Sequence, residues 1–155
     1  MQEKLQLLLS RFIRETDATV LLETLIAVPV LTVFAVGTLE FGNIFWQRQQ
    51  VQIAARDAAR YWSRCRPTFS SCSLTVARNL AFYGNPQGTG GLRVPGWSDA
   101  ADLSIEPAVP PAVATPTDIV RVVATLDYIG SPMISLALPT AITVTYTHEE
   151  RYIGW

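Results

Sequence analysis

The sequence predicts an α+β protein: a long N-terminal transmembrane helix with an amphipathic extension, followed by a small antiparallel β-sheet domain with one short helix. Three observations predict this fold class. Only 16% of the 155 residues are charged, and the apolar residues are concentrated early in the chain. An apolar stripe of helical period follows them. Two segments near the C-terminus alternate apolar and polar residues, as half-buried strands do.

The early apolar segment is long enough to cross a membrane as a helix. Between Thr24 and Leu39 there is no charged residue, and three threonines are the only polar interruptions. Sixteen helical residues cover about 24 Å, and weakly polar flanks extend this beyond the roughly 30 Å of the hydrocarbon core. The segment is too long and begins too late for a conventional cleaved secretory signal. Pro29 lies inside it and predicts a kink.

The same helix is predicted to begin near Ala18, with Thr16 and Asp17 as possible N-caps, and to continue past the membrane to Arg64. Beyond the apolar segment, residues at spacings close to three, four and seven define an apolar stripe: Ile44, Val51, Ala55, Ala58 and Trp62. On another face, three basic residues lie four apart and are interpreted as a solvated surface: Arg56, Arg60 and Arg64.

The rest of the chain predicts one short helix and three strands. "SLTVARNLAFYG" is typical of a helix that stops at Gly84, and "NPQGTGGLRVPGWSD" of a loop. "ADLSIEP" indicates a weak strand. "DIVRVVATLDY" and "AITVTYTHEERY" alternate and predict half-buried antiparallel strands. "GSPMISLALP" between them is too long for a tight turn.

Two cysteines, Cys65 and Cys72, follow the long helix. A disulfide closing a short loop is one interpretation and would imply an oxidising compartment; two unrelated thiols are the other. Six intervening residues do not fit Cys-x-x-Cys metal or redox spacings, and the single histidine cannot complete a typical zinc set. No metal and no cofactor are therefore predicted.

Residues with catalytic potential are few, and no enzyme activity is predicted. His148 is interpreted as a solvated strand residue, and the adjacent Glu149 and Glu150 point to opposite sheet faces, so they do not form a dyad. No Gly-x-Ser-x-Gly nucleophile signature is present. A net charge of −1 gives no indication of nucleic-acid binding.

Glu23 stands at the front of the apolar segment, where a charge is costly. It is either a carboxylate at the membrane edge within reach of water, or an acid that gains a partner only in an oligomer. Membrane orientation is also open. Five arginines follow the segment and three basic residues precede it, which favours a cytoplasmic C-terminal part, whereas a disulfide favours the opposite.

The stretch from "DATVLLETLIAVPVLTVFAVGTLEFGN" to "AARDAARY" resembles the N-terminal module of TadE-like pseudopilins, minor subunits of tight-adherence (Tad, or Flp-type) type IV pili. An acid and a small residue stand before four residues and a glutamate, here Asp17, Ala18 and Glu23. Pro29 follows six positions later. The motif continues with Glu-Phe-Gly at 40–42 and an alanine-rich helix.

The resemblance implies cleavage by a prepilin peptidase between Ala18 and Thr19, although the family usually has glycine where this chain has Ala18. Residues 1–18 would then be a cytoplasmic leader, 19–64 the transmembrane and amphipathic helix, and 65–155 an extracytoplasmic domain in the periplasm or outside the cell. The resemblance also implies that Glu23 pairs with the freed amine of a neighbouring subunit and sets its register.

The resemblance further implies a role in pilus assembly, priming or capping, and hence in surface adhesion. The implied partners are other minor pseudopilins, the major pilin, the inner-membrane assembly platform and the prepilin peptidase. Two alternatives remain open. One is a single-pass anchored binding or sensor domain that never enters a filament. The other is an anchored periplasmic enzyme, for which no catalytic set is found.

Overall fold

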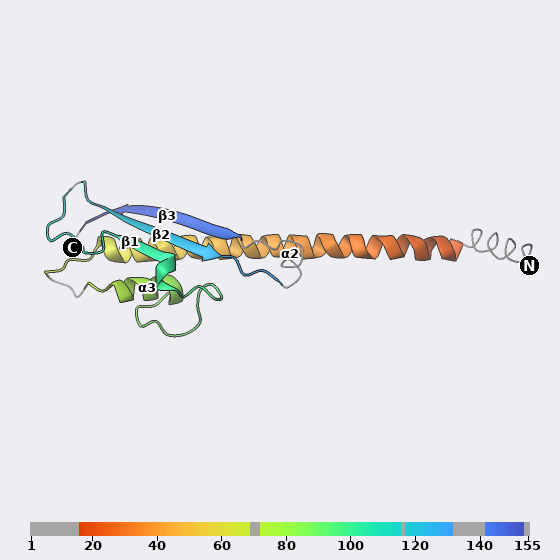
Figure 1. The fold of residues 1–155 in the computed structure, drawn as a ribbon, viewed down its shortest axis with the longest axis horizontal. Coiled ribbons are helices and arrows are strands. Elements are labelled where there is room, and N and C mark those ends of the chain that lie inside the picture. Colours follow the sequence, from red (N-terminus) through yellow and green to blue (C-terminus); the bar gives the residue numbers. More distant parts are fainter. Residues whose placement is uncertain (1–15, 69–71, 116, 132–141, 154–155) are drawn as a thin grey trace, which may run out of the picture. The chain divides into compact units, whose positions relative to one another are not determined.

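A computed structural model describes residues 16–68, 72–115, 117–131 and 142–153. The predicted α+β fold is confirmed, with a long apolar helix followed by a short helix and a three-stranded antiparallel sheet (Figure 1). The chain divides into two compact units, Met1–Phe41 and Gly42–Trp155. The predicted segment "GSPMISLALP" lies largely outside the described residues.

Helix α2 runs from Thr16 to Ser63 and ends one residue before the predicted boundary. Thr16 and Asp17 are already helical, so they lie inside the helix rather than ahead of it as caps. The predicted apolar stripe is confirmed: Val51, Ala55 and Ala58 are fully buried and Trp62 nearly so. Ala54 and Ala59 widen this buried surface, and their small side chains let the helix approach the sheet closely.

Helix α3 spans Leu74–Tyr83 and has the predicted C-terminal stop. Gly84 takes φ +74°, a left-handed conformation that glycine adopts without a Cβ clash, and its N–H donates to the carbonyl oxygen of Leu80. At the other end the Ser73 hydroxyl accepts from the Val76 N–H. The short 3-10 helix η1, Ala100–Asp102, was not predicted.

The sheet has the order β1-β2-β3, with β1 at Leu103–Glu106, β2 at Ile119–Asp127 and β3 at Thr143–Arg151. Both pairings are antiparallel. The predicted inward face of β2 is confirmed, since all its apolar members are buried: Val120, Val122, Ala124, Leu126 and, just beyond the strand, Tyr128. On β3 the side chains that share this face are only half-buried, from Val144 to Glu150.

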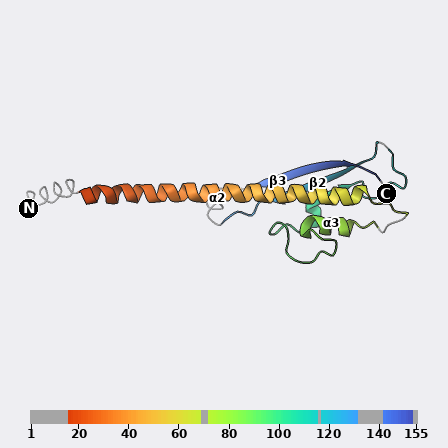
Figure 2. The same ribbon diagram turned by 180° about the vertical axis from the view of Figure 1, so that it is seen from behind.

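The core of the second unit lies between the C-terminal part of α2, the sheet and α3. In Figures 1 and 2 the strands run along this part of α2, and α3 lies on the side of β1. Trp97, from the segment predicted as loop, is 1% exposed and packs edge-on against Phe82 of α3, with ring centroids 4.9 Å apart. Its indole N–H donates to the carbonyl oxygen of Thr125. This loop therefore contributes to the core.

Candidate functional site

The first unit presents its apolar side chains outward. Over its most apolar 18 residues α2 has a mean hydropathy of 2.2, and none of that window is buried. Leu21, Leu25 and Phe34, for example, are each about 70% exposed. Such a surface is unfavourable in water, because each large apolar side chain loses roughly 1.5–3 kcal/mol of burial. By length and composition alone, this helix is able to cross a membrane.

The threonines of the apolar segment satisfy their own hydroxyl groups. Thr24 donates to the carbonyl oxygen of Val20 at 2.7 Å, Thr32 to that of Val28 at 2.7 Å, and Thr38 to that of Ala35 at 2.8 Å. A hydroxyl bonded in this way needs no partner from outside the helix. The polar interruptions noted in the sequence therefore do not weaken the case for a membrane span.

Four residues with predicted roles lie on this helix. The Ala18–Thr19 bond is in its first described turns, Glu23 follows one turn later, and α2 continues through Pro29. The Glu23 side chain is exposed among apolar neighbours and makes no ion pair within the part of the chain that the structure describes. The processing role of Ala18 and Thr19, the register role of Glu23 and the kink at Pro29 stay predictions.

Polar contacts near the start of the second unit were not anticipated from the sequence. The Asn43 amide donates to the Tyr128 hydroxyl at 3.0 Å, and the Gln47 amide donates to the carbonyl oxygen of Ile129 at 3.3 Å. Gln47 is only 2% exposed. Glutamine in an amphipathic helix ordinarily indicates a solvated position, so no local signal marked it as buried. These bonds fix the end of β2 against α2.

Cys65 and Cys72 form a disulfide, which joins the segment after α2 to the start of α3. The Tyr152 hydroxyl donates to the Cys65 carbonyl oxygen, and Ile153 N–H donates to the Ser63 carbonyl oxygen at 2.8 Å. Burial raises the pKa of the Tyr152 hydroxyl, with nearby Arg66 opposing the effect. The chain after β3 is thus held at the same place where α2 ends.

The residues examined for catalysis do not assemble into a reactive set. His148 is half-buried rather than fully solvated, and its ring stacks near that of Tyr146 with centroids 6.4 Å apart. Glu149 is on the other face, where a carboxylate oxygen lies 2.7 Å from a guanidinium nitrogen of Arg121. Among the described residues no cluster of three or more His, Cys, Asp or Glu side chains could hold a metal.

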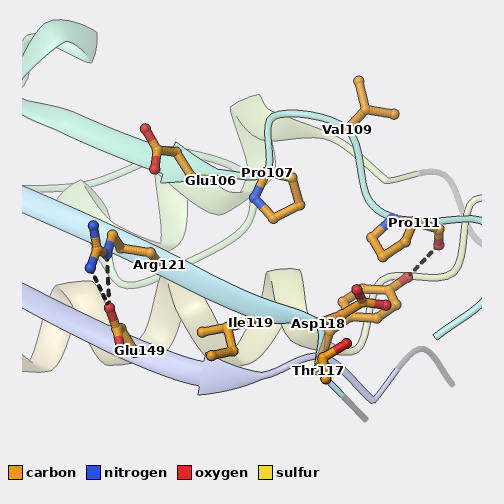
Figure 3. Close-up of a pocket in the computed structure, with 10 residues that line it drawn as sticks. Glu106, Pro107, Val109, Pro111, Thr117, Asp118, Ile119, Arg121 and Glu149 are labelled. Carbon is orange, nitrogen blue, oxygen red and sulfur yellow. Dashed lines mark hydrogen bonds and ion pairs between the residues drawn. The ribbon is translucent and has the colours of Figure 1, made fainter. Parts of the chain in front are cut away.

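A groove of about 640 Å³ lies beside the Arg121–Glu149 pair (Figure 3). Its walls come from the chain after β1, the start of β2 and the end of β3, and combine prolines with the carboxylates of Glu106 and Asp118. Thr117 and Tyr152 supply its only hydroxyl groups, and the latter is hydrogen-bonded to the carbonyl oxygen of Pro111. The described residues that line this groove include no histidine, cysteine or lysine.

These features define an α+β protein with one N-terminal helix that suits a single-pass membrane anchor. Residues 18–60, on α2, match the family model described as TadE-like protein, so the chain is similar to this family over that segment. The resemblance in the sequence is thereby confirmed over this helix. No curated protein and no solved structure matches the chain.

Proposed function

We propose that this protein is a minor pseudopilin of a Tad/Flp-type type IV pilus, acting in assembly, priming or capping of the pilus and hence in surface adhesion. The observation that carries the proposal is the TadE-like match over residues 18–60, on a helix whose apolar side chains are exposed. Its partners are other minor pseudopilins, the major pilin and the inner-membrane assembly platform.

In this proposal a prepilin peptidase on the cytoplasmic side cuts between Ala18 and Thr19. Residues 1–18 are the leader, residues 19–64 the transmembrane and amphipathic helix, and residues 65–155 the extracytoplasmic domain. Two observations support this arrangement. The family match begins at residue 18. The Cys65–Cys72 disulfide suits an oxidising compartment on the far side of the membrane.

In the proposed assembly, Glu23 sets the axial register between neighbouring subunits. Its carboxylate extends from an apolar helix surface and has no ion-pair partner among the described residues. The amine freed at Thr19 of a neighbouring subunit supplies the opposite charge. Attraction between two charges in an apolar medium is strong and falls off with distance, so it favours one axial position. Pro29 removes one helical N–H and kinks the helix nearby.

The processing step is tested by the intact mass and N-terminal sequence of protein extracted from membranes with and without the peptidase. A mature chain beginning at Thr19, seen only with the peptidase, is expected. An unprocessed N-terminus in both samples would favour the alternative, a single-pass anchored binding or sensor domain that is not incorporated into a filament.

Replacing Glu23 with glutamine tests the register role, because it removes the charge and keeps the shape. We expect incorporation into sheared pili, measured by quantitative immunoblotting, to fall at least about tenfold, since an uncompensated buried amine is strongly destabilising. Thr24→Val is the matched control: the Thr24 hydroxyl is bonded within its own helix, so incorporation should be unchanged. Normal incorporation of Glu23→Gln would remove the register role.

A further inference from the structure

Three basic residues form an exposed surface on α2 that we name the arginine face: Arg56, Arg60 and Arg64. They lie at successive helical turns and span about 12 Å. The two ion pairs formed among the described residues, Arg93–Asp57 and Arg121–Glu149, involve none of the three. Like charges four residues apart repel, so the arginine face is mildly destabilising by itself.

Grooves flank the arginine face on both sides. One lies towards β3 and is lined by Ile53, Arg56, Arg60, His148 and Glu150. The other lies towards α3, where Arg60 and Arg64 line it together with Tyr61 and Leu80. Figure 2 shows this part of α2 passing between β3 and α3. The charge of Asp57, which touches both grooves, is taken up by Arg93, with an oxygen–nitrogen distance of 2.5 Å.

The same unit also carries a negatively charged surface, which we name the acidic patch: Asp99, Asp102 and Asp127. It lies at η1 and at the end of β2. Burial raises the pKa of the Asp102 carboxyl, and the negative charges of Asp99 and Asp127 raise it further. Leu103, which follows Asp102, pairs with Ala124 of β2, so η1 lies beside the strand that ends at Asp127. Neither ion pair of the described residues involves them.

We propose that the arginine face of one copy binds the acidic patch of a second copy. The two surfaces carry three positive and three negative charges, on different elements of one unit, so a contact between copies relieves the repulsion within each. Because the surfaces differ, the contact is heterologous, and it leaves one arginine face and one acidic patch free to continue the row. This inference goes beyond the proposed function, since it depends on neither leader cleavage nor Glu23.

The structure also sets the offset between neighbouring copies. Tyr128, which follows Asp127, is hydrogen-bonded to Asn43, so the end of β2 lies level with the start of the second unit. The arginine face begins at Arg56, thirteen residues after Asn43 along α2, and ends eight residues later at Arg64. At 1.5 Å per residue, neighbouring copies are displaced by about 20–30 Å along α2.

Two full-length variants reverse the surfaces separately: R56E/R60E/R64E on the arginine face and D102K/D127K on the acidic patch. Asp99 is kept because its carboxylate caps η1 by accepting from the Ala101 N–H. Each protein is reconstituted into liposomes with a photo-crosslinking residue, benzoyl-phenylalanine, at position 53, in the groove beside the arginine face. The yield of covalent dimers is then measured.

For each variant alone, the yield of covalent dimers should fall about tenfold or more, because like charges then face each other. A mixture of the two should recover the wild-type yield within about twofold, since both contacts between one variant and the other pair opposite charges. Recovery also shows that both variants are folded. Undiminished dimers from the separate variants, or no recovery in the mixture, would overturn the proposal.

R56K/R60K/R64K is the matched control, because it keeps the charge of the arginine face and should keep the dimers. Loss of dimers in this variant would overturn the charge-based contact. The liposomes contain phosphatidylglycerol, so the experiment also tests a lipid partner. Crosslinks from position 53 to this lipid, without covalent protein dimers, would assign the arginine face to the membrane surface and overturn the proposal.

Discussion

Asp102 lies at the end of η1, directly before β1, and folding changes its affinity for a proton. Burial is the larger cause of its raised pKa, with Asp99 and Asp127 adding to the effect. The folded protein therefore holds the Asp102 proton more tightly than the unfolded chain does. The stability that this proton contributes is present below the ordinary pKa of 3.8 and is lost as the pH rises through the higher folded value.

Asp102→Asn should therefore stabilise the protein near neutral pH and not at low pH. We expect a gain of about 0.5 kcal/mol in the free energy of unfolding at pH 7, since Asp102 is only partly buried. The gain should disappear as the pH falls below the ordinary pKa of 3.8, because Asp102 is then protonated in both states. Urea unfolding of the detergent-solubilised chain, followed by tryptophan fluorescence, measures it. A gain that is constant across this pH range would contradict the assignment.

Helix α3 shows how a single glycine determines where an element ends. Gly84 has φ +74°, and a Cβ at this position would lie 3.0 Å from the guanidinium Nε of Arg93. Arg93 is itself held by Asp57 and by the bond from its N–H to the carbonyl oxygen of Phe82. Arg93 thus joins the end of α3 to α2, and Gly84, without a side chain, leaves room for its guanidinium group.

Gly84→Ala should lower the free energy of unfolding by about 1–2 kcal/mol, from left-handed backbone strain and the crowding of Arg93. Gly91→Ala is the matched control, because no heavy atom lies within 4 Å of its would-be Cβ and it has no positive φ. The midpoint of urea unfolding distinguishes them. Equal midpoints for the two variants would mean that the strain at Gly84 is negligible.

The periodic elements could be predicted from the sequence, because burial of one face forces a pattern. Val120, Val122 and Ala124 alternate on β2, and Val51, Ala55 and Ala58 recur along α2, so the side chains reveal the element. Trp97 could not be placed in the core, since it lies in a loop without a period. For the candidate site, the TadE-like helix and Glu23 were found from the sequence by motif and hydropathy, whereas their roles rest on a partner outside this chain.

The long-range polar contacts of the second unit could not be predicted from the sequence either. Asn43 with Tyr128, and Asp57 with Arg93, join residues separated by 85 and 36 positions. Single residues of these types are common on exposed surfaces, and only the path of the chain brings them together. The pairing of the two cysteines is different, because the sequence contains only Cys65 and Cys72, so a disulfide within it can join only these two.

At the scale of the whole molecule, the disulfide of the second unit lies near the end of α2, where the C-terminal segment also packs. The Cys65 carbonyl oxygen accepts from Tyr152, and the Ser63 carbonyl oxygen accepts from Ile153, so these contacts join the end of α2 to the C-terminal segment. The Cys65–Cys72 bond fixes the loop between α2 and α3 at the same place. Loss of this bond increases the freedom of the unfolded chain.

Replacing Cys65 and Cys72 together with serine should lower the free energy of unfolding by about 2–3 kcal/mol, the value expected for a loop of this length. Unfolding of the detergent-solubilised chain by urea measures the change. The matched control is a reducing agent, which should destabilise the wild-type protein by a similar amount and leave the variant unchanged. An equal effect of the reducing agent on both proteins would contradict a structural disulfide.

The three threonines of the apolar segment keep their hydrogen bonds when the surroundings of the helix change. Thr24, Thr32 and Thr38 donate to carbonyl groups of their own helix, whether lipid or protein lies outside. Transfer of this segment from the bilayer into a packed bundle of helices therefore exchanges one apolar medium for another and breaks no hydrogen bond of these side chains. Since no charged residue lies between Glu23 and Glu40, the polar side chains of this stretch impose no fixed depth on the helix.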